Sequence, residues 1–224
     1  MQVEPLQYYV NKLKNKEYFT LSRFGDGELL CMWGRQGRNS NKCRYTPHLR
    51  KALLDSMRFG DDPTFIYGLQ RVLPKDQERV LREYPNINWH DSEIFSIAVA
   101  EGRLYPLIEQ LRKMDLVIIG NETLKPIGEI IPYKKFIEVQ KFDAYEERER
   151  VIKEIMEYGK PAVYLFSTGM AACAFVAELH GKIPDSFFID IGHIWDPFTG
   201  LMSRCDLKGK TREDIEKNLY EETK

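Results

Sequence analysis

"AVYLFSTGMAACAFVAELHG", residues 162–181, decides the fold. A continuous apolar run ends in the small-residue turn "STG", and an alanine-rich stretch of helical character follows. A strand that lacks polar alternation is typical of a parallel sheet whose two faces are both covered by helices. The stretch therefore predicts a buried strand, a tight turn and a helix that packs against the sheet.

The same pattern extends through the C-terminal half. "MDLVIIG" (114–120), "KFIEVQ" (135–140) and "SFFIDIGH" (186–193) are further predicted strands. Between them, residues 143–161 predict a helix. Asp143 is its expected N-cap, Glu146 follows three residues later, and Gly159 and Pro161 mark its end. Strands that alternate with helices in this way indicate an α/β fold.

The N-terminal half follows the same alternation. Residues 3–15 and 46–57 predict helices, the second begun by Thr46 and Pro47, and "EYFTLSRF" (17–24) and "PTFIYGLQ" (63–70) predict strands. Weaker helical patterns occupy 75–83, 92–101 and 104–112. We therefore expect one Rossmann-like α/β domain over residues 1–224, with a mainly parallel sheet flanked by helices.

Composition narrows the classes of function. The formal net charge is -1, from 33 basic and 34 acidic residues, so no overall field would attract DNA or an anionic membrane. The four cysteines form no C-x-x-C pair, which argues against a zinc ribbon or a disulfide scaffold. Neither an apolar signal core nor a stretch long enough to span a bilayer is apparent. These features predict a soluble, cytoplasmic protein.

Ligands of open parallel sheets bind at the carboxyl ends of the strands, where the strand order reverses. Four predicted strand ends carry polar or glycine-rich sequences: "RFGDGE" (23–28), "IGNETL" (119–124), "FSTGM" (166–170) and "DIGHIWD" (190–196). If these segments lie in one sheet, they converge. We expect them to form a common crevice lined by Asp26, Glu28, Asn121, Ser167, Thr168, Asp190 and His193.

Asp26 and Glu28 form a D-x-E pair between glycines, directly after a predicted strand. In an extended or turning segment both carboxylates point the same way, and two carboxylate oxygens suit Mn²⁺ or Mg²⁺ completed by phosphate oxygens and water. A plain capping or turn role explains the spacing equally well. Arg23, on the same segment, would either grip a phosphate or pair with Asp26.

The other strand ends also allow two interpretations. Ser167 and Thr168 occupy a turn suited to a phosphate or sugar oxygen, although the full dinucleotide and P-loop patterns are absent. Asn121 would bond a base or ribose, or simply initiate a turn. His193 would be a metal ligand, phosphate donor or acid/base, or a structural residue, and Asp190 would orient it. A basic loop, which would cover a phosphate or contact an anionic acceptor, carries Arg35, Arg38, Lys42, Arg44, Arg50 and Lys51.

Two separated stretches together resemble a family. "FTLSRFGDGEL" and the series "DLVIIGN", "FIEVQKFDAYEERERVIKEI", "PAVYLFSTGMAACAFVAEL" and "FFIDIGHI" are similar to glycosyltransferases of the GT-D fold. The resemblance implies transfer of a sugar, commonly glucose, from a UDP-sugar donor, with Mn²⁺ or Mg²⁺ held by the D-x-E carboxylates. It assigns Asp26 and Glu28 to the metal and Arg23 and Gly25 to the flanks of that motif.

The same resemblance matches Asp190 and His193 to the D-I-G-H segment of the family. After that segment the family carries further acidic residues, one a candidate base, whereas here Asp196 is the nearby carboxylate. The family's arginine-bearing segment is changed as well, with Lys125 as a substitute for donor contacts. We therefore take Asp190, His193 and Asp196 as candidate catalytic residues.

These observations predict a metal-dependent hexosyltransferase whose acceptor is a hydroxyl of a glycan, a glycoprotein or a modified nucleobase. One alternative is a metal-dependent phosphohydrolase or nucleotidyltransferase, for which Glu122, Asp190 and Asp196 are the further acidic candidates. Another alternative is a binding subunit that has kept a nucleotide-sugar crevice without the chemistry. The sequence leaves the acceptor and the oligomeric state open.

Overall fold

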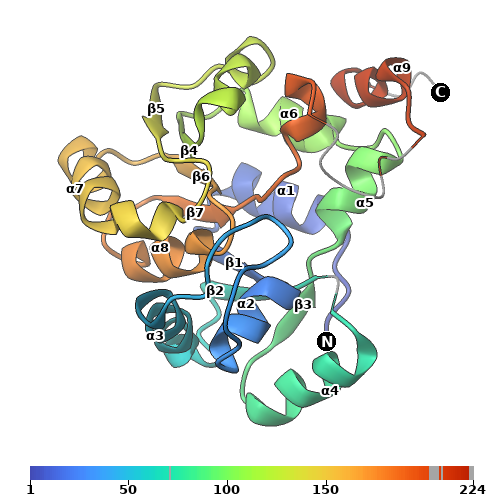
Figure 1. Ribbon diagram of the computed structural model, residues 1–224. Coiled ribbons are helices and arrows are strands. Elements are labelled where there is room, and N and C mark those ends of the chain that lie inside the picture. Colours follow the sequence, from blue (N-terminus) through green and yellow to red (C-terminus); the bar gives the residue numbers. More distant parts are fainter. Residues whose placement is uncertain (71, 202–206, 208, 222–224) are drawn as a thin grey trace.

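Seven parallel strands form one sheet in this computed structural model, which describes residues 1–70, 72–201, 207 and 209–221 (Figure 1). Their order across the sheet is β3-β2-β1-β7-β6-β4-β5, and every pairing between them is parallel. The strands are β1 (Thr20–Phe24), β2 (Phe65–Leu69), β3 (Trp89–Asp91), β4 (Leu116–Gly120), β5 (Lys135–Glu138), β6 (Val163–Ser167) and β7 (Phe187–Asp190).

Helices cover both faces of the sheet (Figure 1). One face packs against α1 (Leu6–Asn15), α5 (Ile94–Ala100), α6 (Tyr105–Leu111), the 3-10 helix η2 (Glu122–Glu129) and α9 (Arg212–Glu216). The other packs against α2 (Asp26–Met32), α3 (Pro47–Asp55), α4 (Pro74–Glu83), α7 (Arg148–Tyr158) and α8 (Ala171–Leu179). Within the described residues, the remaining 3-10 helices are η1 (Ser56–Phe59), η3 (Ala144–Glu147), η4 (Asp196–Thr199) and η6 (Lys217–Leu219).

The central strands are buried along their whole length, as their uninterrupted apolar sequences require. In β4, Leu116 and Ile118 enter the core on one face of the sheet, while Val117 and Ile119 enter the core on the other. All of these side chains are fully buried. Since successive side chains of a strand point to opposite faces, only a sheet with two covered faces buries both sets. The predicted α/β class with a parallel sheet is confirmed.

Three local expectations were wrong. The segment after β1 is not a loop, because α2 begins at Asp26. A short strand, β3, lies at the edge of the sheet where no strand was expected. Asp143 does not cap a helix: it has a left-handed backbone (φ 54), a 3-10 turn follows it, and α7 begins only at Arg148. The helix does end at Gly159, which has the expected left-handed conformation (φ 53).

The order of the strands places a switch between β1 and β7. From β1 the chain proceeds outward to β2 and β3, and the strands β4 to β7 occupy the other side. β1 leads directly into α2, and β7 leads into the turn at Gly192. The carboxyl ends of β1 and β7 therefore lead into the two halves of the fold, the position at which open sheets of this type bind ligands. Within the described residues, no helix combines the length and the apolar character needed to cross a membrane.

Candidate active site

A crevice opens at the carboxyl ends of β1 and β7, at the switch in strand order. The start of α2, the turn before α8, the end of β2 and the segment after β7 form its walls. Four of the expected residues line it together: Asp26, Glu28, Asp190 and His193. Arg23 and Gly25 also line it. The sheet thus brings together side chains that lie more than 160 positions apart in the sequence.

The D-x-E carboxylates lie in the first turn of α2. Asp26 is exposed, and its Oδ1 accepts a hydrogen bond from the backbone N–H of Gly27 (2.8 Å). Glu28 is half-buried and folds back, so that its Oε2 accepts from the N–H of Gly25 (2.9 Å). That contact is the capping role that the spacing also allowed. Residues two apart on a helix do not face each other, so the expected parallel orientation of an extended segment is absent.

Glu28 has an unusual electrostatic environment. Burial raises the pKa of its carboxyl to about 7, and the negative charges of Asp190 and Asp26 act in the same direction. Hydrogen bonds from the backbone at Glu28 itself and at Gly25 oppose this rise. The ionised form is therefore costly, and a cation placed beside the carboxylate would favour ionisation.

Arg23 and Asp190 form a buried ion pair at the base of the crevice. Their side chains are only 2% and 7% exposed, and Arg23 Nη2 lies 3.5 Å from Asp190 Oδ1. Asp190 also accepts hydrogen bonds from the backbone N–H groups of Arg23 (3.3 Å) and Gly192 (3.0 Å). Burial raises the pKa of Asp190, and the Arg23 guanidinium opposes that rise. Asp190 thus fixes the arginine and the turn after β7.

The Arg23 guanidinium is not saturated by this pair. Within the described residues, Nε and Nη1 are buried and have no hydrogen-bond partner. Burying charged donors without hydrogen-bond partners costs free energy, so a bound water, ion or ligand is expected to satisfy them. Gly192 allows the close approach: it has φ 59, and a Cβ built there would lie 2.0 Å from Nη2.

His193 is held between two neighbours. Its Nδ1 lies 3.0 Å from Asp196 Oδ2, and its Nε2 lies 3.4 Å from Asn41 Nδ2. The His193 side chain lines the crevice and is 30% exposed. The Asp196 side chain lies outside the crevice lining and is 13% exposed. The carboxylate is therefore placed to hold the imidazole rather than to reach a ligand itself.

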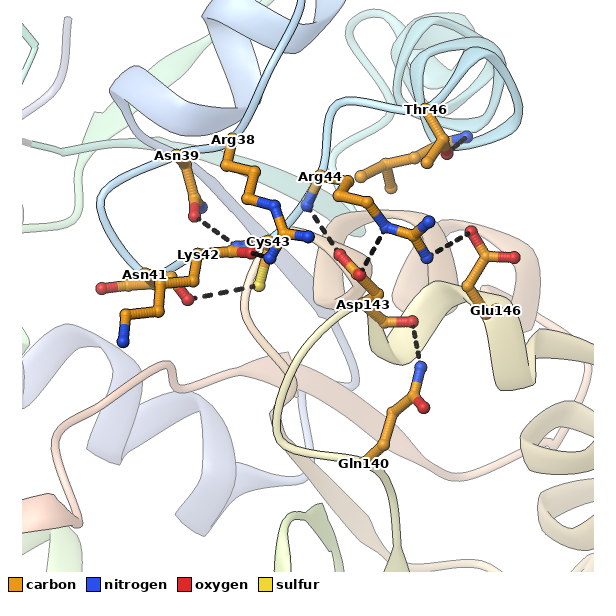
Figure 2. Close-up of polar contacts among 11 residues, drawn as sticks. Arg38, Asn39, Asn41, Lys42, Cys43, Arg44, Thr46, Gln140, Asp143 and Glu146 are labelled. Carbon is orange, nitrogen blue, oxygen red and sulfur yellow. Dashed lines mark hydrogen bonds and ion pairs between the residues drawn. The ribbon is translucent and has the colours of Figure 1, made fainter.

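The loop between α2 and α3, residues 33–46, crosses the mouth of the crevice near β1 and β7 (Figure 1). Its backbone folds back on itself through a bridge between Arg38 and Arg44, and Asn39, Ser40 and Asn41 contribute to the crevice lining. Figure 2 shows that Asp143 holds the loop at Arg44. Asp143 accepts hydrogen bonds from the backbone N–H (2.6 Å) and the Nε (2.7 Å) of Arg44.

With the loop in this position the crevice is small. Its volume of about 60 Å³ is far below the several hundred Å³ that enclose a ligand of drug size. A ligand of that size would fit only with the loop moved aside. The residues at the tip of the loop, Asn39 to Asn41, were missed in the sequence because polar residues in a basic loop give no local signal of where the loop packs.

Four expected residues lie at the same edge of the sheet but outside the crevice. Asn121 accepts hydrogen bonds from the backbone N–H (3.1 Å) and hydroxyl (2.5 Å) of Thr123, the turn role that remained open. Lys125 is exposed and pairs with Glu138 at 2.7 Å. Ser167 donates to the Gly192 carbonyl (2.7 Å), and Thr168 is buried beside it. From this turn, Gly169 and Met170 line the crevice instead.

The donor set fits a divalent cation that takes its other ligands from a phosphate. Among the described residues no group of three or more His, Cys, Asp or Glu side chains forms a complete chelate. Asp26 and Glu28 both line the crevice, and in each the backbone engages one carboxylate oxygen. Mg²⁺ and Mn²⁺ are commonly bound by one or two carboxylates together with phosphate oxygens and water. The residues present are compatible with that chemistry.

Comparison with solved structures gives the fold its relatives. A structure of "A New Glycosyltransferase (DUF1792) from Streptococcus sanguinis" superposes with a TM-score of 0.66 at 20% identity, over 88% of this chain and 83% of that one. The chain has the fold of the DUF1792 domains. A second, described as a domain of unknown function 1792 with a distinct glycosyltransferase fold, gives 0.66 at 18% identity, over 100% and 92% of the two chains.

A third DUF1792 structure gives a TM-score of 0.64 at 19% identity, over 88% of this chain and 80% of that one. Neither a protein-family model nor a curated protein matches the sequence. At these identities the likeness concerns the fold. It confirms the fold that the two sequence stretches resembled, and it leaves the chemistry to be argued from the crevice.

Proposed function

We propose that the protein is a metal-dependent glycosyltransferase that moves a sugar, glucose in the first instance, from a UDP-sugar to an acceptor hydroxyl. One observation carries the proposal: at the switch point of a glycosyltransferase-like sheet, one crevice joins three carboxylates, a histidine and a buried guanidinium with donors that have no partner among the described residues. Carboxylates and guanidinium together suit a diphosphate and its cation, and the histidine suits proton transfer.

Asp26 and Glu28 would hold the cation, and Arg23 would bind the diphosphate through the N–H groups that have no partner among the described residues. When bound, Mn²⁺ or Mg²⁺ supplies positive charge against the charge of the departing nucleoside diphosphate. Asp190 keeps the guanidinium directed into the crevice. Lys125, paired with Glu138 outside the crevice, would contact the donor only if that pair opened.

His193 would remove the proton from the acceptor hydroxyl. With Nδ1 protonated and donating to Asp196, Nε2 is left as the acceptor that faces Asn41. When the loop opens and Asn41 leaves, the acceptor hydroxyl would take its place. In this scheme Asp196 is a positioning residue that fixes the tautomer and stabilises the imidazolium that forms. The candidate base is therefore His193 and not the carboxylate beside it.

The test is release of UDP from a panel of UDP-sugars with Mn²⁺, with and without glycan acceptors. His193→Gln should lower kcat by about 10²- to 10⁴-fold while donor binding stays unchanged, because general base catalysis contributes that much. Asp196→Asn should have a smaller effect and should change the pH profile. Glu122→Gln, an exposed carboxylate outside the crevice, is the matched control for Glu28→Gln.

Glu28→Gln keeps an oxygen for the Gly25 N–H, so its loss of metal-dependent turnover would reflect the carboxylate charge rather than folding. Full activity in that variant would refute the metal assignment. UDP-sugar cleavage at the same rate with and without an acceptor would favour a hydrolase. Donor binding without any turnover would favour a binding subunit.

A further inference from the structure

A second cavity lies on the outer side of the loop. Its volume is about 330 Å³, and it lies between the loop and the first turns of α3, with the end of α2 as its floor. Arg35, Arg50 and Lys51 line it, and no Asp or Glu side chain belongs to its described lining. We call it the basic pocket. The net charge of the chain is -1, whereas the charged residues in the described lining of this cavity are three cations. The cavity is therefore a local concentration of positive charge.

The guanidinium groups of the basic pocket have spare donors. Arg50 Nε donates to the backbone carbonyl of Met32 (3.0 Å), which orients the side chain, and among the described residues neither Arg50 nor Arg35 has a carboxylate partner. Lys51 alone pairs with an acid, Asp55, one turn further along α3 (2.5 Å). An oriented guanidinium with free Nη donors matches the oxygens of a phosphate or carboxylate.

The basic pocket adjoins the crevice. Burial raises the pKa of Tyr45, which lines the pocket; the carboxylate of Asp26 raises it further, and the guanidinium of Arg35 lowers it. α2 contributes Asp26, Gly27 and Glu28 to the crevice and Cys31 to the pocket, while the loop contributes residues 39–41 to the crevice and residues 34–36 to the pocket. Burial and the charge of Glu28 likewise raise the pKa of Cys31, in the floor of the pocket, and the charge of Arg50 lowers it. The two cavities share α2 and the loop as their common wall.

A larger cavity, of about 800 Å³, lies between α3, α7 and α8 and differs in charge. There Arg148 pairs with Glu178 through two hydrogen bonds of 2.7 Å, and Arg150 pairs with Glu147. Lys51, Arg148 and Arg150 pair with carboxylates of the same cavity, and Arg58 donates to the backbone carbonyls of Asp55 and Ala177. The basic pocket is therefore the better candidate for an external anion.

We propose that the basic pocket binds a phosphate or carboxylate group of the acceptor, while the acceptor's reacting hydroxyl enters the crevice. The inference rests on the proposed glycosyltransferase function. The volume suits a sugar-sized group, and because the loop separates the two cavities, one acceptor would reach both only with the loop moved aside. Anchoring the acceptor on both sides of the loop would also favour the open position of the loop that donor entry requires.

The first experiment is calorimetric titration of inorganic phosphate into the protein at low ionic strength, with Mg²⁺ and saturating UDP so that the donor's phosphate positions are filled. Phosphate should still bind, and Arg50→Gln should weaken that binding at least tenfold. Arg35→Gln removes an exposed side chain that has no ion pair or hydrogen bond among the described residues, and it should weaken phosphate binding several-fold. Arg38→Gln is the control, because it removes the same charge from the same loop outside the pocket.

Equal phosphate affinity in all four proteins, or no phosphate binding, would overturn the inference. Competition between phosphate and UDP would overturn it too, because it would put the anion in the donor crevice. If UDP itself fails to bind the wild-type protein, the proposed function fails and the acceptor assignment fails with it. Phosphate binding that Arg50→Gln abolishes would then still establish an anion site.

A transfer assay then distinguishes the source of the anion. Glucose, a hexose phosphate and a hexuronate are compared as acceptors at equal concentration, with UDP release without acceptor subtracted. The charged acceptor that fits should have a KM at least tenfold below that of glucose, and Arg35→Gln should raise this KM toward the value for glucose. The same preference in Arg35→Gln and Arg50→Gln as in the wild-type protein would contradict the assignment.

Discussion

Gly192→Ala should destabilise the protein far more than an ordinary glycine substitution. Gly192 has φ 59, and an added Cβ would lie 2.0 Å from Arg23 Nη2, so the guanidinium would have to leave its place beside Asp190. A non-glycine residue in this backbone region costs about 1–2 kcal/mol, part of which is offset because alanine restricts the unfolded chain. Separating a buried ion pair adds about 3–5 kcal/mol.

The total loss is therefore about 4 kcal/mol for Gly192→Ala. Gly181→Ala is the matched control: it has φ 72, and no atom lies within 4 Å of an added Cβ, so only the backbone cost of about 0.5–1 kcal/mol applies. With a urea dependence of about 3 kcal/mol/M, the unfolding midpoints should fall by about 1.3 M and 0.3 M. Equal shifts in the two variants would refute the role of Gly192 in seating Arg23.

Three further outcomes follow from other parts of the fold. Asp143→Asn keeps an acceptor for the backbone N–H of Arg44 but removes the negative charge of a half-exposed ion pair, so loop opening should become easier by up to about 1 kcal/mol. UDP should then bind up to about fivefold faster in a stopped-flow measurement. An unchanged rate would mean that the loop does not limit entry. Burial lowers the pKa of His90, so its stabilising effect is complete above about pH 6.5 and declines as the pH falls through the depressed value. His90→Asn should therefore flatten the fall in urea stability as the pH drops below about 6.5, whereas an identical slope would contradict this. Burial raises the pKa of Cys31 to about 11, so Cys31→Ser should leave the rate of native thiol labelling unchanged, and a slower rate would show that this thiol is reactive.

The sequence predicted the sheet well because its signals are local. Val163 to Phe166 and Leu116 to Ile119 are continuous apolar runs, and only a strand covered on both faces accounts for such runs between helices. The short strand β3 gave no such signal. Its residues pair with β2 and, at His90, with Gln2, which are contacts between distant segments.

The errors at Asp26 and Asp143 have a common physical cause. Each begins a short pattern that fits a cap, a turn or a ligand, and the pattern alone does not decide between these roles. The Asp143 carboxylate accepts a hydrogen bond from the backbone N–H of Arg44, 99 residues away in the sequence, so it is not free to cap α7. Arg23 did carry an unused signal: a charged residue within the buried strand "TLSRF" predicts a paired or ligand-binding group.

The central claim is that the crevice binds the sugar donor. The decisive measurement is calorimetric titration of UDP-glucose into the wild-type protein and Glu28→Gln, each with and without Mn²⁺. We predict Mn²⁺-dependent binding to the wild-type protein that Glu28→Gln weakens at least tenfold, with Glu122→Gln unchanged. Binding of equal strength in Glu28→Gln, or no binding of UDP-glucose with Mn²⁺ to the wild-type protein, would contradict the account.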